Sequence, residues 1–160
     1  MKGRSARQSH VEMIQQVLPG DTNPHGTVFG GKVMEWIDIA GAVTAMRHAR
    51  ASVVTASFDR VDFHFPARSG DVMNLSGRVN YTGRTSLEVS VEVLAENPRT
   101  GKKVLTTEAL ITYVAVDAMG SPKEVEPLVP RTADEVERFR AGEARRRRRL
   151  AERSKRRRSR

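Results

Sequence analysis

One aspartate, Asp38, lies in the middle of the most apolar stretch of the chain, which runs from residue 33 to residue 46. In a helix, Met34 and Ala42 would lie one turn to either side of it on the same face. A carboxylate in such surroundings is costly unless it is paired or lines a cleft. A carboxylate at a cleft can act as a general base, which is our interpretation of Asp38. The alternative is a solvent-facing stripe that Asp38 shares with Glu35.

The pair Gly30-Gly31 comes directly before this stretch. The first N–H groups of a helix lack intrahelical acceptors and carry partial positive charge. Without side chains at this point, a carbonyl group could approach the backbone, and Gly31 is the expected donor to an oxyanion. Seven residues of helix separate Gly31 from Asp38 by roughly 10 Å, so one carbonyl would need a bent path or a second subunit to use both. The glycines alone fit an ordinary turn, but together with Asp38 they indicate acyl transfer.

The elements that must hold these groups follow from the apolar pattern. A helix is expected from Gly31 to about His48, apolar around most of its circumference and therefore buried on nearly all sides. Strand-like runs come before and after it in the sequence, most of them alternating in hydrophobicity, with a bulge near Asp59-Arg60. The last run is apolar at both odd and even positions, as a central strand is. These runs cover residues 8–18, 54–65, 75–81, 86–93 and 103–116. The order predicts an α+β fold in which an antiparallel sheet wraps around one long helix and a second subunit completes the cover.

Composition restricts the class of protein. Hydrophobic residues make up 38% and charged residues 29% of the 160 residues, which suits a soluble globular chain. The absence of cysteine excludes disulfides and thiolate metal sites. The N-terminus is polar, and no apolar run reaches the roughly 20 residues needed to cross a bilayer. We therefore expect a cytoplasmic protein with no membrane partner.

The net charge of +9 is confined to the C-terminus, because residues 1–130 are balanced and the whole excess falls in residues 131–160. We divide the chain accordingly into a catalytic domain, 1–130, and a basic C-terminal helix and tail, 131–160, expected to be partly disordered. The helix should begin near Thr132. The basic run has no aromatic residue for base stacking, so nucleic-acid binding is not expected. Deleting residues 145–160 should leave the activity of the domain largely intact.

Four motifs together resemble those of the hotdog-fold acyl-CoA thioesterases, in particular the bacterial acyl-CoA hydrolases related to the mammalian brain-type enzyme. The first is DTN followed by G at residues 21–26, with FGG at 29–31 and IDIAG at 37–41. The later ones are VVTAS and VDF at 53–63, TGRTS at 82–86, and EA with YVAVD at 108–117. The resemblance covers roughly residues 8–130.

The resemblance implies a hotdog fold and hydrolysis of acyl-CoA to CoA and a carboxylic acid. Asp38 would activate water or attack the thioester, Asn23 would reach the site from a neighbouring subunit, and Gly31 would bind the thioester oxygen. The residues implied near the substrate and CoA are Gly30, His25, Val54, Thr55, Arg84, Thr85 and Ser86. It further implies a homodimer, or a trimer of dimers, and no metal or cofactor apart from the CoA of the substrate.

Two other classes remain open. Hotdog hydratases and dehydratases pair a histidine with a carboxylate, and His25 is the histidine beside the motif, although we expect it to be a loop residue near the substrate. A noncatalytic CoA-binding or nucleic-acid-binding protein is the other alternative, with its affinity in the basic tail.

Overall fold

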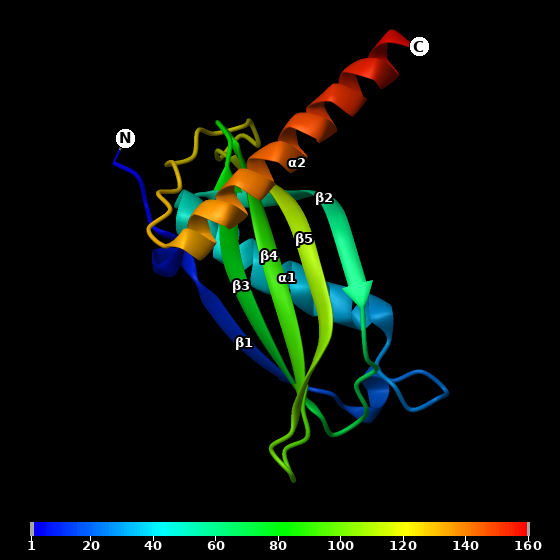
Figure 1. The fold of residues 1–160 in the computed structure, drawn as a ribbon. Helices are drawn as coiled ribbons and strands as arrows, with labels where there is room; N and C mark the ends of the chain where they lie inside the picture. The colour runs from blue at the N-terminus through cyan, green and yellow to red at the C-terminus, as the bar shows by residue number, and fades with distance from the viewer. Residues whose placement is uncertain (1, 160) are drawn as a thin grey trace.

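The fold is a five-stranded antiparallel sheet with one helix on each face. A computed structural model describes residues 2–159. In chain order the elements are η1 (Ala6–Ser9), β1 (Val11–Gln16), η2 (Pro19–Asp21), α1 (Gly30–Ala49), β2 (Ser52–Phe63), β3 (Val72–Thr82), β4 (Ser86–Glu96), β5 (Lys103–Val116) and α2 (Ala133–Arg158). The strands lie side by side in the order β1-β3-β4-β5-β2. Figure 1 shows α1 along one face of the curved sheet and α2 across the other. The predicted α+β arrangement, with its long helix and charged C-terminal helix, is confirmed.

Helix α1 packs against the sheet along one side only. Residues such as Trp36, Ile37 and Ala40 are buried there. A β-carbon on Gly77 of β3 would overlap the Thr44 hydroxyl, so the helix and the strand come into close contact at this glycine. On the opposite side, Ile39 is 47% exposed. The apolar circumference predicted for this helix is therefore only partly covered within one chain.

Strand β2 forms a free edge of the sheet, since it pairs with β5 alone. Its register shifts between Thr55 and Ser57 and again between Phe58 and Arg60, which confirms the predicted bulge. Val54, near the start of this edge, is 50% exposed. An open edge with exposed apolar side chains is suited to pairing with another strand.

Helix α2 is fixed to the outer face of the sheet by close packing and by charge. Thr132 caps its first turn, with its hydroxyl 3.2 Å from the backbone nitrogen of Glu135. Further along, Arg145 forms two hydrogen bonds, of 2.6 and 2.9 Å, with the carboxylate of Glu88, which is only 2% exposed. Deleting residues 145–160 would take the charged partner away from this buried carboxylate, so we expect the deletion to destabilise the outer face of the sheet. The division of the chain at residue 130 stays a prediction.

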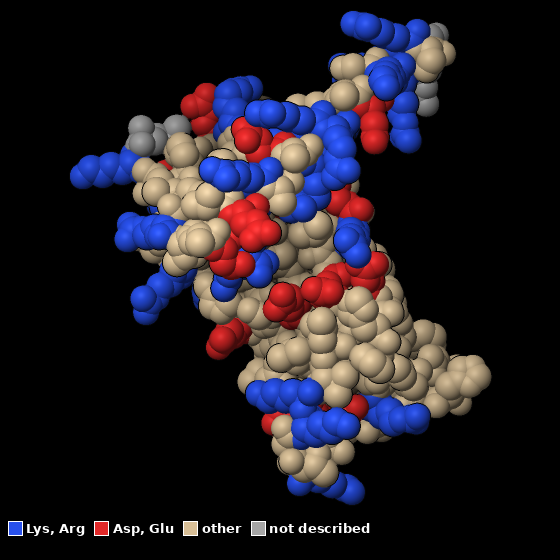
Figure 2. Space-filling model, viewed as in Figure 1, with Lys and Arg blue, Asp and Glu red and all other residues tan. Residues whose placement is uncertain are grey.

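The last turns of α2 extend beyond the sheet and carry a concentration of Lys and Arg (Figures 1 and 2). The structure describes a helix over Ala133–Arg158. The partial disorder expected for residues 131–160 stays a prediction. None of the described helices combines the length and the apolar character that a bilayer crossing requires.

His48, near the end of α1, makes the stability of the fold depend on pH. Its ring is fully buried, with Nε2 3.0 Å from the carbonyl oxygen of Glu126 and Nδ1 3.4 Å from the Ser9 hydroxyl. Burial lowers its pKa below the ordinary value of 6.5, and the nearby Arg4 guanidinium adds to this effect. Below pH 6.5, His48 therefore binds a proton more readily in the unfolded chain than in the native protein.

We accordingly expect the free energy of unfolding to fall as the pH decreases from about 7 to 5, and to fall less steeply in His48→Gln. Urea denaturation at a series of pH values measures both slopes. Equal slopes in the two proteins would show that His48 is not responsible.

Candidate active site

The carboxylate of Asp38 is held where α1, β2 and β5 meet. Its Oδ1 accepts hydrogen bonds from the Thr55 hydroxyl, at 2.9 Å, and from the Tyr113 hydroxyl, at 3.0 Å. Thr55 and Tyr113 lie directly opposite each other in the β2–β5 ladder. Two neighbouring strands thus bind the same oxygen of a helical side chain, which fixes its orientation.

The other oxygen of Asp38 is available to a ligand. Within residues 2–159, no donor is hydrogen-bonded to Oδ2 of Asp38, and no unpartnered side-chain oxygen is buried. Oδ2 is therefore accessible to solvent, while Oδ1 is occupied by the two hydroxyl groups. This arrangement gives a carboxylate with one free, oriented oxygen, as a general base or a nucleophile requires.

Tyr113 supplies a hydroxyl that remains protonated. Its side chain is fully buried, and burial, followed by the charge and hydrogen bond of Asp38, raises its pKa far above the ordinary value. It therefore acts as a donor to Asp38 at any pH near neutrality. A β-carbon on Gly41, one turn along α1, would overlap the Tyr113 hydroxyl, so the glycine makes room for this contact.

The start of α1 offers backbone donors beside an apolar pocket. In the described chain, the amides of Gly30 and Gly31 have no hydrogen-bond acceptor, and Gly31 is exposed. A pocket of about 280 Å³ lies next to them, lined by Val28, Gly30, Val33, Phe63, His64, Phe65, Pro66, Ala67, Met73, Thr106 and Thr107. The free amides and the apolar lining suit a carbonyl group attached to a hydrocarbon chain.

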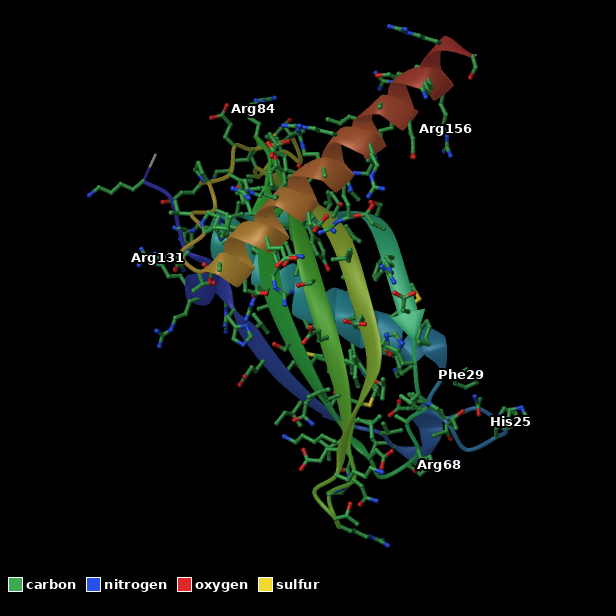
Figure 3. The ribbon with its side chains drawn as sticks, in the orientation of Figure 1. His25, Phe29, Arg68, Arg84, Arg131 and Arg156 are labelled. Atoms are coloured by element: carbon green, nitrogen blue, oxygen red, sulfur yellow. The ribbon has the colours of Figure 1, made fainter. Side chains whose placement is uncertain are left out.

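The loop before α1 does not reach the Asp38 carboxylate of its own chain. The amide nitrogen of Asn23 donates to the Thr27 hydroxyl at 2.9 Å, and its oxygen accepts from the backbone nitrogen of His25 at 3.0 Å. His25 is exposed at the tip of this loop and points away from the body (Figure 3). Within the described chain, no hydrogen bond joins the His25 ring to Asp38.

The remaining predicted positions surround the β3–β4 turn and the edge strand. Arg84 pairs with Glu124 at 3.4 Å, and the carbonyl of Thr85 accepts from the backbone nitrogen of Ala115 at 2.9 Å. Ser86 begins β4. Val54 precedes Thr55 on β2, so it lies beside the carboxylate site without contributing a polar group.

Comparisons with known proteins place the chain in a family. The profile of the thioesterase superfamily matches residues 25–102. An uncharacterized acyl-CoA thioester hydrolase of Bacillus subtilis is 41% identical over 133 residues, which cover 83% of this chain and 77% of that protein. The chain belongs to the thioesterase superfamily.

Solved thioesterase structures agree in fold over nearly the whole chain. A hexameric acyl-CoA thioesterase in its apo form is 45% identical and superimposes with a TM-score of 0.90, covering 95% of this chain and 97% of its own. An acyl-CoA hydrolase of Staphylococcus aureus, solved with butyryl coenzyme A and coenzyme A, is 37% identical with a TM-score of 0.89, covering 99% and 96%. The hotdog fold expected for this member of the superfamily is confirmed.

Tyr113 is a residue of the candidate site that sequence reasoning did not connect to Asp38. The sequence placed Tyr113 in the last strand, and Thr55 near CoA, but did not connect either of them to Asp38. Only the pairing of β2 with β5 brings the two hydroxyl groups to the same carboxylate. A small residue at position 41, one turn after the carboxylate, was the available signal.

A second pocket, of about 390 Å³, lies on the opposite face of the sheet beneath α2. Although it is larger, its arginines are already paired: Arg60 with Asp62, Arg138 with Asp134, and Arg145 with Glu88. It is also separated from Asp38 by the sheet, so the candidate active site is the one on the α1 face. Among residues 2–159, no three His, Asp or Glu side chains are arranged to hold a metal ion.

Replacing Gly41 by alanine tests the contact between α1 and β5. The new methyl group would overlap the Tyr113 hydroxyl, so we expect the free energy of unfolding to fall by about 1–3 kcal/mol and Asp38 to lose a donor. Adding Tyr113→Phe removes the overlapping oxygen and should restore part of the stability without restoring the donor. Urea unfolding of the two single variants and the double variant measures the coupling. Strictly additive losses would contradict the proposed clash.

Proposed function

We propose that the chain is an acyl-CoA thioesterase, which hydrolyses acyl-CoA to free CoA and a carboxylic acid with Asp38 as general base or nucleophile. The observation that carries this proposal is the half-fixed carboxylate, with Oδ1 held by Thr55 and Tyr113 and Oδ2 open. The acyl-CoA hydrolase names of its relatives support the same substrate class.

In the general-base form, Oδ2 of Asp38 takes a proton from water as the water oxygen bonds to the thioester carbon. The resulting oxyanion accepts a hydrogen bond from the Gly31 amide. The carbon–sulfur bond then breaks, CoA leaves as a thiolate, and the proton held by Asp38 can pass to it. In the nucleophilic form, Oδ2 bonds to the carbon first, and water later hydrolyses the mixed anhydride. Both forms give the same products.

We propose that the working site lies between two copies of the chain. Three features support this: the free edge of β2, the exposed apolar side of α1, and the Asn23 loop that does not meet its own Asp38. Pairing of two β2 edges would allow Asn23 of the partner subunit to position the water or the carbonyl. A relative of 45% identity is hexameric, which supports a dimer assembled further into a trimer of dimers.

The spacing of three residues along the sequence of a relative supports roles for Asn23, Asp38 and Thr55. Solved forms of the S. aureus enzyme include alanine variants of one asparagine, one aspartate and one threonine, which follow one another at intervals of 15 and 17 residues. Asn23, Asp38 and Thr55 follow one another at the same intervals in this chain. We propose that these three are the corresponding residues.

For the rest of the substrate, we propose that the acyl chain enters the apolar pocket beside Gly30. His25, Val54 and the turn residues Arg84, Thr85 and Ser86 would then contact the CoA portion. We further propose that the reaction uses no metal or cofactor apart from the CoA of the substrate, and that the protein works in the cytoplasm.

Removing the carboxylate tests the proposed chemistry. Asp38→Ala should lower kcat by about a hundredfold or more, because the general base is lost. The measurement is the release of thiol from a panel of acyl-CoA substrates, from acetyl to palmitoyl. Thr55→Ser, which keeps a hydroxyl donor, is the matched control and should retain most of the activity. Hydrolysis by Asp38→Ala at the rate of the unmodified protein would refute the role of Asp38.

Mixing two inactive variants tests whether the site is shared. Asn23→Ala should also lose activity, since its amide would serve the other subunit. If Asp38→Ala and Asn23→Ala chains are unfolded together and refolded, some mixed dimers should contain one intact site and recover part of the activity. Complete absence of recovery, with mixed dimers demonstrated by mass spectrometry, would argue that each chain has its own site.

A further inference from the structure

The β3–β4 turn lies about one pantetheine length from the Asp38 site. Leu87 of β4 is opposite Tyr113 of β5, which in turn is opposite Thr55 of β2. The last residue of the turn, Thr85, is two residues before Leu87. The turn therefore lies about 7 Å along the strands and about 10 Å across the sheet from Thr55. The long pantetheine arm of CoA can bridge such a separation between a thioester at Asp38 and phosphates near the turn.

An arginine of α2 lies directly on this turn. A β-carbon on Gly83 would be 2.8 Å from Nε of Arg146 and 2.9 Å from the Ser86 hydroxyl. The guanidinium of Arg146 therefore rests against the backbone of Gly83, which a side chain at that position would prevent. The position of Arg84 in Figure 3 marks the same turn beside the middle of α2.

Unlike the other arginines around this turn, Arg146 has no carboxylate partner within residues 2–159. Arg145 is bound to Glu88, Arg149 lies 3.2 Å from Asp59, and Arg84 lies 3.4 Å from Glu124. In the described part of the chain, no carboxylate comes within 4.0 Å of Arg146. Of the arginines around the turn, Arg146 thus has its charge available for an external anion.

We propose that Arg146 binds a phosphate group of CoA beside the β3–β4 turn, so that α2 contributes to substrate recognition. This inference rests on the proposed thioesterase function. A guanidinium matches the geometry of phosphate oxygens and binds them through charge-assisted hydrogen bonds. The Gly83 backbone and the Ser86 hydroxyl mark the place on the turn where this guanidinium lies. The contact concerns binding alone, because the turn is remote from the reacting carbon.

The test compares a substrate that has phosphates with one that lacks them. Arg146→Gln should raise KM for acyl-CoA about three- to tenfold and leave kcat unchanged. The same acyl group on pantetheine, which has no phosphate, should be hydrolysed equally well by the variant and the unmodified protein. Gly83→Ala, which displaces the guanidinium without changing the charge, should raise KM for acyl-CoA in the same way.

Arg148→Gln is the matched control, because it removes the same charge from the opposite side of the same helix. It should change KM for acyl-CoA by less than about twofold, because the long-range attraction between this arginine and CoA is screened by salt. Equal effects of the two arginine variants, or a loss that persists with acyl-pantetheine, would overturn the assignment of Arg146. If the unmodified protein releases no thiol from any acyl-CoA, the proposed function itself is refuted. Circular dichroism shows whether each variant is folded.

Discussion

The candidate active site depends on one hydrogen-bonded contact between a helix and a sheet. Asp38 projects from α1, and its Oδ1 is held by hydroxyl groups from two paired strands. This contact satisfies a carboxylate that would otherwise be costly in apolar surroundings. It also selects which oxygen remains free, so the same interaction stabilises the packing of α1 and orients the reactive group. Tyr113 suits this task because its burial keeps the hydroxyl protonated.

Glycines allow the two helices to approach the sheet closely enough for such contacts. Gly41 lets the Tyr113 hydroxyl pass beside α1, and Gly77 receives Thr44 on the same face. On the outer face, Gly142 of α2 lies against Tyr81, whose ring is 4.9 Å from that of Phe139. Both helices are thus fixed at small residues, and polar side chains near those points reach partners on the strands.

Much of the fold could be predicted from the sequence, because it depends on local patterns. The apolar run after Gly31 predicted α1, alternation predicted the strands, and the phase change near Asp59 predicted a bulge. Asp38 was also identified from its surroundings alone. Tyr113 could not be linked to Asp38 in this way, since the contact joins residues 75 positions apart and depends on strand pairing. The anchoring of α2 was missed for the same reason, because its charges suggested a solvated tail.

The buried carboxylate of Glu88 has a consequence for the order in which the chain folds during synthesis. Its partner Arg145 follows 57 residues later in the chain. The strand that carries Glu88 therefore leaves the ribosome before the arginine does. Until Arg145 has emerged, that carboxylate must stay hydrated and the outer face of the sheet must stay uncovered. The native packing of this face is therefore completed only after α2 has been made.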